Sequence, residues 1–403
     1  MDLIIYYNYH IDPLELINPL CKINPEYSLE KRTTDHLYLD LPKLQNKLKA
    51  WFQENSNKWS KTAIGITGAW LNDDLEPRCI TRDLNWGTPV PNTDKYGDKY
   101  KDKVFYVWFD APIGYISITA NYTDLWELWW KKNNDFEVEH VEFMAKDNVP
   151  FHSVIFPGTL MGSGEEYNLV NKIAAVEYLN YEDKKFSKSR GTGIFGDTIQ
   201  NTGIPSDVWR YYLLSIRPEG SDSSFQWTDF ADKNNNELVN NLGNLTNRIL
   251  SFSYKKFKLI PDFYSLELED TVFIEEVETM TLEYIQLMED IKLKEGIKQV
   301  MLISKLGNKY LQERQPWIHF KTNKNLCSSI IHISIHFLKH LGTLMEPFLP
   351  DYSNYIATIL KTDCKIINSK IELNKLSGSL EKPDILFNKI TEEDVIKFKD
   401  LYG

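Results

Sequence analysis

A short basic segment, residues 184–191, carries the clearest sign of chemistry in the sequence. It reads Lys184-Lys185-Phe186-Ser187-Lys188-Ser189-Arg190-Gly191 and comes just after a predicted strand. Such a loop can wrap a polyphosphate, because lysine ammonium groups neutralise charge on a departing pyrophosphate while serine hydroxyls and backbone N–H groups donate hydrogen bonds. Taken alone, this segment is also consistent with a solvated surface loop that is open to phosphorylation.

The elements that must position this loop lie between residues 103 and 183. Three apolar runs occur there, at residues 104–109, 138–145 and 173–179, and each is followed by a helical pattern. Continuous apolar runs are typical of strands covered on both faces, so we expect half of a parallel α/β sheet. Active sites in such sheets lie at the carboxyl ends of the strands, where we place Asp110 and Asp147.

Helical patterns dominate on both sides of this region. The stretch from Leu41 to Glu54 predicts one helix, and from Gly196 onward the sequence gives no strand signal. Leu238, Leu242, Leu245, Ile249 and Phe252 follow the spacing of a helix core stripe. Further helices are predicted over residues 279–313, ending before Pro316, and over residues 328–344. The second half of the chain is therefore predicted to be a helical bundle.

Composition excludes several classes of protein. The 403 residues include 46 basic and 57 acidic ones, a net charge of −11, which argues against a protein that coats nucleic acid by bulk attraction. No apolar stretch reaches the roughly eighteen residues of a membrane span, and no signal peptide is apparent, so we expect a cytoplasmic protein without membrane partners. The four cysteines are far apart and indicate neither a disulfide framework nor a zinc site.

Four segments together resemble one family. Residues 185–189 (KFSKS) are similar to the K-M-S-K-S signature of class I aminoacyl-tRNA synthetases, with Phe186 in place of the usual methionine. Residues 82–91 (RDLNWGTPVP), 106–115 (YVWFDAPIGY) and 146–152 (KDNVPFH) resemble methionyl-tRNA synthetases, in that family's order. The resemblance runs from about Leu14 to the C-terminus, and residues 78–248 most resemble eukaryotic cytosolic members.

The resemblance implies a ligase that uses ATP, with Mg²⁺, to join methionine to tRNA(Met). It implies a methionine pocket made of Trp108, Ala111, Pro112, Tyr115, Phe151 and His152. Apolar walls suit an unbranched thioether, with two polar groups near its sulfur. The ATP site would contain Asp147, Lys185, Ser187, Lys188 and Ser189, and the catalytic residues would be Arg82, Lys185 and Lys188. Alternatively, His152 is a core histidine whose hydrogen bonds are all made within the protein, and Trp108 only packs against the sheet.

A second recognition site is implied on the helix expected over residues 234–252. Asn244 and Arg248 lie four residues apart and so share a helix face. The family reads the CAU anticodon with this pair, and Trp317 matches the tryptophan on which an anticodon base stacks. Such recognition of splayed bases needs no basic surface overall. Alternatively, the Asn244 and Arg248 pair only caps a helix, and Trp317 only packs at the end of the bundle.

Some expected features of the family are not found in these residues. No His-x-Gly-His signature occurs, and Cys21-Lys22-Ile23-Asn24 holds only one cysteine of the Cys-x-x-Cys that many relatives use for zinc. We therefore expect no bound zinc, and a chain that lacks the N-terminal half of the nucleotide-binding fold. Such a chain would need a polypeptide carrying that half for activity.

Three functions compete at this stage, all on an α/β plus all-α fold. The first is methionine–tRNA ligase, the second a catalytically silent tRNA-binding protein, and the third another class I synthetase such as the cysteinyl or leucyl enzyme. The methionine pocket argues against the third. We expect residues 1–95 to be a connective region with a linker, 96–183 the second half of a Rossmann-type domain, 184–232 the phosphate loop with a stem-contact region, and 233–403 the helical anticodon-binding domain.

Overall fold

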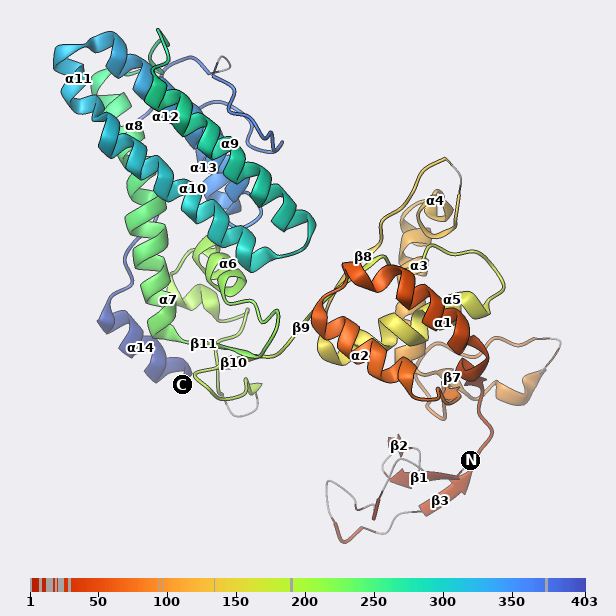
Figure 1. Ribbon diagram of the computed structural model, residues 1–403. Coiled ribbons are helices and arrows are strands. Elements are labelled where there is room, and N and C mark those ends of the chain that lie inside the picture. Colours follow the sequence, from red (N-terminus) through yellow and green to blue (C-terminus); the bar gives the residue numbers. More distant parts are fainter. Residues whose placement is uncertain are drawn as a thin grey trace. The chain divides into compact units, whose positions relative to one another are not determined.

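Two units make up the chain in this computed structural model, residues 1–177 and residues 178–403 (Figure 1). The structure describes residues 2–6, 9–11, 17, 18, 20, 25–27, 30–93, 95, 97–133, 135–188, 191–373 and 376–403. Side chains before residue 33 are described only at 17, 18, 20 and 25–27. Each unit is described below by itself.

The first unit combines short strands with helices. Its strands are β1 Asp2–Tyr6, β2 Tyr9–Ile11, β3 Glu30–Thr33, β4 Tyr38–Leu39, β5 Arg78–Cys79, β6 Thr81–Arg82, β7 Val104–Phe105, β8 Val141–Ala145 and β9 Lys172–Val176. Its helices are α1 Leu41–Asn55, η2 Ser56–Lys58, α2 Lys61–Asn72, η3 Asp98–Tyr100, α3 Val107–Tyr122, α4 Trp126–Trp130, η4 Lys146–Asn148, the π-helical η5 Phe151–Ile155 and α5 Phe156–Gly162.

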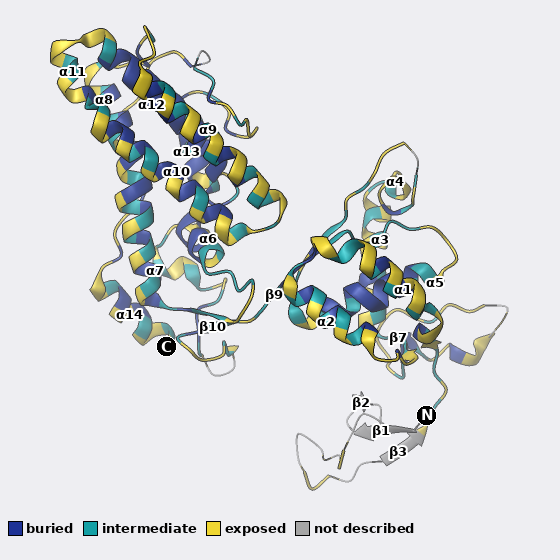
Figure 2. Cartoon of the chain, in the orientation of Figure 1, coloured by how far each residue is buried: buried dark blue, intermediate teal, exposed yellow. Residues whose placement is uncertain are grey.

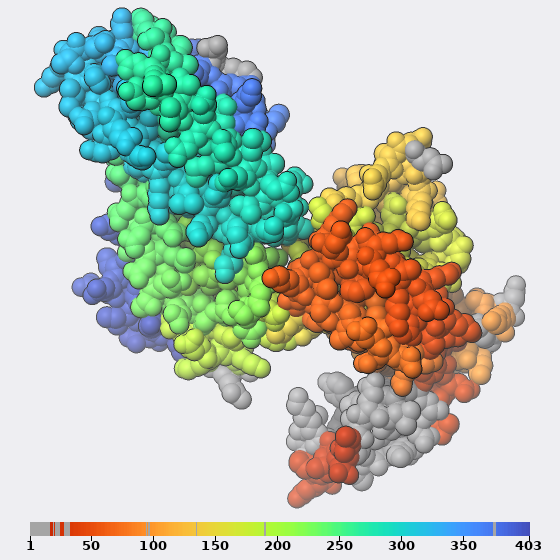
Figure 3. Space-filling model, in the orientation of Figure 1, coloured from red at the N-terminus to blue at the C-terminus, as the bar shows by residue number. Residues whose placement is uncertain are grey.

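The parallel pair predicted for this unit is confirmed by β8 and β9. They pair in parallel from Val141 opposite Lys172 to Ala145 opposite Val176. Helix α2 covers the pair, because the Ser60 side chain caps α2 and accepts a hydrogen bond from the Ala175 backbone at 3.0 Å. The predicted helix over residues 41–54 is also confirmed as α1, and α1 and α2 form much of one face of the unit (orange, Figure 3).

The first apolar run, residues 104–109, is only partly a strand, which corrects the prediction. Val104 and Phe105 pair antiparallel with β6, and the backbone turns into α3 at Val107. A short apolar and aromatic run fits a buried strand and a helix start equally well, so periodicity could not separate them. Asp110 consequently lies in the first turn of α3, where its carboxylate accepts a hydrogen bond from the Thr88 hydroxyl at 2.8 Å. It does not follow a strand of the parallel pair.

The second unit is a helical bundle attached to two short strands. The strands are β10 Leu179–Tyr181 and β11 Ser223–Phe225, and they pair in parallel. The helices are η7 Ile199–Thr202, α6 Ser206–Ser215, α7 Trp227–Lys233, the π-helical η8 Asn234–Gly243, α8 Asn244–Lys256, α9 Leu268–Glu289, α10 Leu293–Arg314, α11 Pro316–Thr322, α12 Lys324–Met345, α13 Pro350–Ile359 and α14 Glu392–Tyr402. Strand β11 contradicts the expectation of no strand after Gly196. It is three residues long and begins with two serines, and Phe225 is its single buried residue, so no apolar run predicted it.

The core of the bundle follows the predicted stripe. Leu238, Leu242, Leu245 and Ile249 are all buried, although the stripe crosses from the π-helical turns of η8 into α8. Helix α12, predicted over residues 328–344, is buried almost all round, as its continuous dark colour in Figure 2 shows. A helix that is buried on every side lies in the centre of a packed domain.

The long helix predicted over residues 279–313 is in fact two helices. Helix α9 ends at Glu289 and α10 begins at Leu293, with Ile291 between them in the left-handed conformation at φ 58°. An isoleucine rarely adopts that conformation, and neither glycine nor proline marks the turn, so no residue type there predicts a helix break.

Candidate functional site

A cavity of about 440 Å³ lies in the first unit between α3, β8 and the turn that leads to η5. Five of the six residues predicted to hold methionine line it: Trp108, Ala111, Pro112, Tyr115 and His152. Helix α3 presents four of them, because residues 108, 111, 112 and 115 recur at helical spacing and share one face. These predicted residues therefore lie on one face of α3, although part of this segment was predicted to be a strand.

Tyr115 and His152 form a polar pair at this cavity. The His152 Nδ1 atom lies 2.9 Å from the carbonyl oxygen of Asn148, which can only accept, so Nδ1 carries the proton. Nε2 then accepts from the Tyr115 hydroxyl at 3.0 Å. Burial, reinforced by the nearby Glu142 carboxylate, raises the pKa of Tyr115, which keeps its hydroxyl protonated. The pair therefore offers a polar edge beside the apolar wall, which suits a thioether.

Phe151, the sixth predicted residue, supports the cavity from behind. Its ring stacks on Trp108 with centroids 4.4 Å apart, and it is not itself part of the cavity wall. Offset stacking of this kind fixes the orientation of the indole. The contribution of Phe151 is thus to hold the Trp108 wall in place.

The cavity also has a wall that sequence reasoning missed. Trp130, His140 and Glu142 line it, with His140 Nε2 3.2 Å from Glu142 Oε1 and the Trp130 ring edge-on to the imidazole at 5.2 Å. Glu142 is only 9% exposed. Glu142 lies on β8 and His140 directly precedes that strand, and their spacing of two residues was the available signal.

Asp147 and Arg82 lie in the first unit, outside the lining of the cavity. Asp147 is in η4, directly after the carboxyl end of β8, as predicted for the parallel sheet. Arg82 lies on β6, where its guanidinium sits 3.8 Å from the centroid of the Tyr106 ring and donates to the carbonyl of Thr81 at 2.9 Å. These contacts hold Arg82 flat against an aromatic surface.

The basic loop belongs to the second unit and forms a small hairpin. Ser187 and Thr192 exchange backbone hydrogen bonds at 2.9 and 3.0 Å. Gly193, at φ 105°, leaves no space for a side chain, because a Cβ there would lie 2.4 Å from the Phe186 ring. The Gly193 N–H donates to the carbonyl of Tyr402 at the end of α14, so the last helix fixes the base of the hairpin.

The three lysines of this loop face solvent. Lys185 is exposed, and Lys188 is 77% exposed with its ammonium 3.3 Å from Asp197. An exposed pair of this kind is weak, so phosphate can readily replace the carboxylate. Ser189 and Arg190 lie outside the described residues.

The three residues predicted to read an anticodon come together in the second unit. The Arg248 guanidinium lies 5.4 Å from the centroid of the Trp317 ring, and Asn244 lies one turn before Arg248 on α8. Trp317 is 38% exposed. An exposed indole beside a guanidinium and an amide can stack on a base while hydrogen bonds reach its edge.

Two residues of α10, not anticipated from the sequence, complete this face. Asn308 Oδ1 is the acceptor for Arg248 Nη1 at 3.4 Å and for the Asn244 amide at 3.5 Å, while Gln312 Oε1 is 3.5 Å from Arg248 Nη2. The Asn308 amide in turn donates to Asn241 Oδ1 at 3.0 Å. Their spacing of four was visible in the sequence, but only the packing of α10 against α8 brings them to this face.

Metal and membrane signals are limited. Among the residues that the structure describes, no three histidine, cysteine or acidic side chains are grouped so that they could hold a metal ion. Cys79, Cys327 and Cys364 are free, and Cys21 lies outside the described residues. Within the described part of the chain, no helix has the length and apolar character needed to cross a membrane.

Comparison with known families gives two matches along the chain. The profile of tRNA synthetases class I (M) matches residues 6–250, and that of the anticodon binding domain of methionyl tRNA ligase matches residues 260–403. The first covers the cavity and the basic loop, and the second covers Trp317.

Individual proteins are similar over nearly the whole chain. The cytoplasmic methionine–tRNA ligase of Arabidopsis thaliana is 50% identical over 413 residues, and the probable cytoplasmic enzyme of Dictyostelium discoideum is 46% identical over 401. These alignments cover 98% of this chain but 51% and 53% of those relatives, so the chain spans about half their length.

A solved structure shares the fold. The Mycobacterium tuberculosis methionyl-tRNA synthetase bound by methionyl-adenylate has a TM-score of 0.78 and 19% identity, and the match covers 96% of this chain and 76% of that one.

Proposed function

This chain belongs to the class I tRNA synthetases of the methionyl type, and from that premise we propose that it acts in the ligation of methionine to tRNA(Met). The observation that carries the proposal is the face formed by Asn244, Arg248 and Trp317, which has the chemistry needed to read unpaired bases. The names of the relatives support the same activity and a cytoplasmic location.

The reaction has two steps: methionine is activated by ATP, and the methionyl group is then transferred to the tRNA. The α-carboxylate of methionine attacks the α-phosphorus of ATP, which forms methionyl-adenylate and releases pyrophosphate. A terminal ribose hydroxyl of the tRNA then attacks the adenylate carbonyl, which forms the ester and releases AMP. Positioning and phosphate electrostatics account for such catalysis without a covalent enzyme intermediate.

Within the first step, the α3 cavity would hold the methionine side chain. Trp108, Ala111 and Pro112 offer apolar contact, and the Tyr115–His152 pair places neutral polar atoms beside the sulfur. These apolar and aromatic walls favour an unbranched apolar side chain. The Glu142 carboxylate, on another wall of the cavity, lies 3.2 Å from His140 Nε2.

The basic loop would bind phosphate, and we assign Lys185, Ser187, Lys188 and Ser189 to the triphosphate. Within the first unit, we assign Arg82 to phosphate charge and Asp147 to ordering the nucleotide. Mg²⁺ would arrive on the ATP phosphates as part of the substrate. Lys188 would act most strongly once negative charge builds up on the leaving pyrophosphate.

A methionine-dependent ATP–pyrophosphate exchange assay, run beside tRNA charging, tests the proposal. Exchange that requires methionine, followed by charging of tRNA(Met), is the expected result. Anticodon-dependent tRNA binding without any exchange would instead favour the second function, a silent tRNA-binding protein. Exchange with cysteine or leucine in place of methionine would contradict the methionine assignment.

A further inference from the structure

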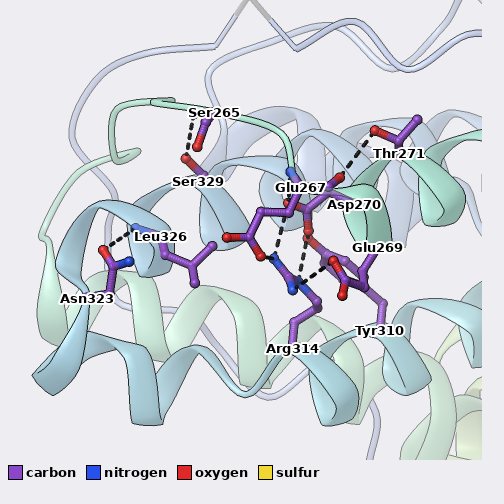
Figure 4. A network of polar contacts seen from close by, with 10 residues as sticks. All are labelled: Ser265, Glu267, Glu269, Asp270, Thr271, Tyr310, Arg314, Asn323, Leu326 and Ser329. Atoms are coloured by element: carbon purple, nitrogen blue, oxygen red, sulfur yellow. Dashed lines mark hydrogen bonds and ion pairs between the residues drawn. The ribbon is translucent and has the colours of Figure 1, made fainter.

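Arg314, the last residue of α10, is enclosed by acidic side chains from the start of α9. Its Nη2 atom donates to Glu267 Oε2 at 2.7 Å and to Asp270 Oδ2 at 3.3 Å, and its Nε atom lies 3.0 Å from Asp270 Oδ1 (Figure 4). Only 10% of the Arg314 side chain is exposed, and Asp270 is fully buried. We call Arg314, Glu267, Asp270 and Tyr310 the α9–α10 clamp.

The clamp is built into the core on the α9 side. The Tyr310 hydroxyl donates to Asp270 Oδ1 at 2.7 Å, and its ring stacks on Phe273 with centroids 4.1 Å apart. Asp270 Oδ2 also accepts from the Glu267 backbone N–H, which closes the capping box of α9. A buried carboxylate needs a compensating charge, so Asp270 holds the Arg314 guanidinium in place.

The residue after Arg314 decides where the chain goes next. Gln315 adopts the left-handed conformation, at φ 40° and ψ 58°, and Pro316 then begins α11. A left-handed non-glycine residue costs about 1 kcal/mol and persists only where its surroundings hold it. The clamp holds Arg314, which immediately precedes Gln315. Trp317 comes two residues after Gln315.

We propose that the α9–α10 clamp positions Trp317: it fixes the turn at Gln315 so that the indole stays beside Arg248, ready to stack on an unpaired RNA base. This inference rests on the proposed function, since it assigns a purpose to a turn at the anticodon-type face. Arg314 is a positioning residue here. Its guanidinium is engaged by the buried Asp270 and by Glu267, so it acts on RNA only through Trp317.

The test is a double-mutant cycle between Arg314 and Trp317, read as tRNA affinity. Arg314→Lys keeps the charge but loses the forked geometry, and we expect it to weaken binding of a tRNA with a CAU anticodon about 5-fold. In a Trp317→Ala background the same change should have no further effect. Glu313→Gln, at the exposed neighbour of Arg314, is the matched control and should stay within about 2-fold of the unchanged protein.

A structural readout accompanies the cycle. In protein labelled with 5-fluorotryptophan, the ¹⁹F resonance of Trp317, assigned by its loss in Trp317→Phe, should shift in Arg314→Lys and stay fixed in Glu313→Gln. If Arg314→Lys fails to fold by circular dichroism, Glu267→Gln removes one partner and leaves Asp270 paired, and it should show the same dependence on Trp317 with a smaller loss.

The outcomes separate the two claims. An equal loss of affinity from Arg314→Lys with and without Trp317, or an unmoved Trp317 resonance, would overturn the clamp's positioning role. If Trp317→Ala leaves tRNA binding intact, the anticodon assignment of the proposed function fails, while the resonance still reports whether the clamp positions the indole.

Discussion

At the scale of single residues, the hydrogen bond between Tyr115 and His152 has a defined direction. The Asn148 carbonyl fixes the imidazole proton on Nδ1, and Nε2 therefore receives the proton of the tyrosine hydroxyl. The pair thus presents a directed polar edge to the cavity, which Glu142 also lines.

Removing either member of the pair should weaken methionine binding. We expect Tyr115→Ala and His152→Ala to raise the Michaelis constant for methionine roughly 10-fold in pyrophosphate exchange, because each removes one side of the hydrogen bond that lines the cavity. Tyr122→Phe is the matched control, since Tyr122 is 89% exposed on the same helix. Constants that stay at the unchanged protein's value in both alanine variants would remove the pocket assignment.

Lys188 is expected to affect rate more than binding. We expect Lys188→Ala to lower the turnover of pyrophosphate exchange on the order of 100-fold with little change in the Michaelis constant for methionine, because its charge matters most in the transition state. Lys184→Ala, at the first lysine of the same segment, is the control. A Lys188→Ala protein with normal turnover would refute the phosphate role.

The family resemblance predicted most of the residues that line the cavity but not its full wall. Trp108, Tyr115 and His152 were identified because they belong to segments that resemble a family. Trp130 and Glu142 were missed because they become neighbours of that set only when α4 and β8 pack against α3. Such neighbours depend on tertiary contacts that no local pattern encodes.

At the scale of elements, helix α12 holds two buried histidines that make stability depend on pH. Burial lowers the pKa of His336 and of His340 to about 4, from an ordinary value of 6.5, with the Lys339 charge acting in the same direction. The unfolded chain therefore takes up these protons near pH 6.5, while the folded chain resists until about pH 4. The stability they contribute is present above pH 6.5 and is lost as the pH falls toward 4.

Urea unfolding at pH 7.5 and pH 5.0 measures this dependence. We expect a loss of about 2 kcal/mol per histidine between the two pH values, since one pKa unit corresponds to about 1.4 kcal/mol. His340→Gln can still hydrogen bond to Thr281, whose hydroxyl lies 2.8 Å from His340 Nε2, and should remove about half of the loss. If this variant shows the same pH dependence as the unchanged protein, His340 is not buried in its neutral form.

Elements were predicted best where burial imposes a long regular pattern. The stripe from Leu238 to Ile249 is of this kind, because its buried face fixes the period, and α12 is a long helix that is buried almost all round. The break at Ile291 and strand β11 were missed, since each depends on packing in the bundle and neither contains a glycine, a proline or a long apolar run. Short irregular features are held by their neighbours more than by their own sequence.

At the scale of the whole molecule, the acidic charge and the proposed RNA recognition are compatible. The net charge of −11 disfavours binding by bulk attraction, yet stacking on Trp317 and edge contacts from Arg248 and Asn244 need only a small local surface. Specificity should therefore depend on the bases more than on the charge of the nucleic acid. The four-part division predicted from the sequence stays a prediction, while the structure itself separates two units at residue 177.

The most direct test is the affinity of the 403-residue protein for tRNA(Met) with its CAU anticodon and for the same tRNA with an altered anticodon. Fluorescence anisotropy should show tighter binding of the CAU form, and Trp317→Ala and Arg248→Ala should each weaken that form by about 1–3 kcal/mol while hardly changing the altered one. Trp86→Ala, at a tryptophan that is 90% exposed in the first unit, should change neither. Equal affinity for both tRNAs, or equal weakening of both by Trp317→Ala, would contradict the account.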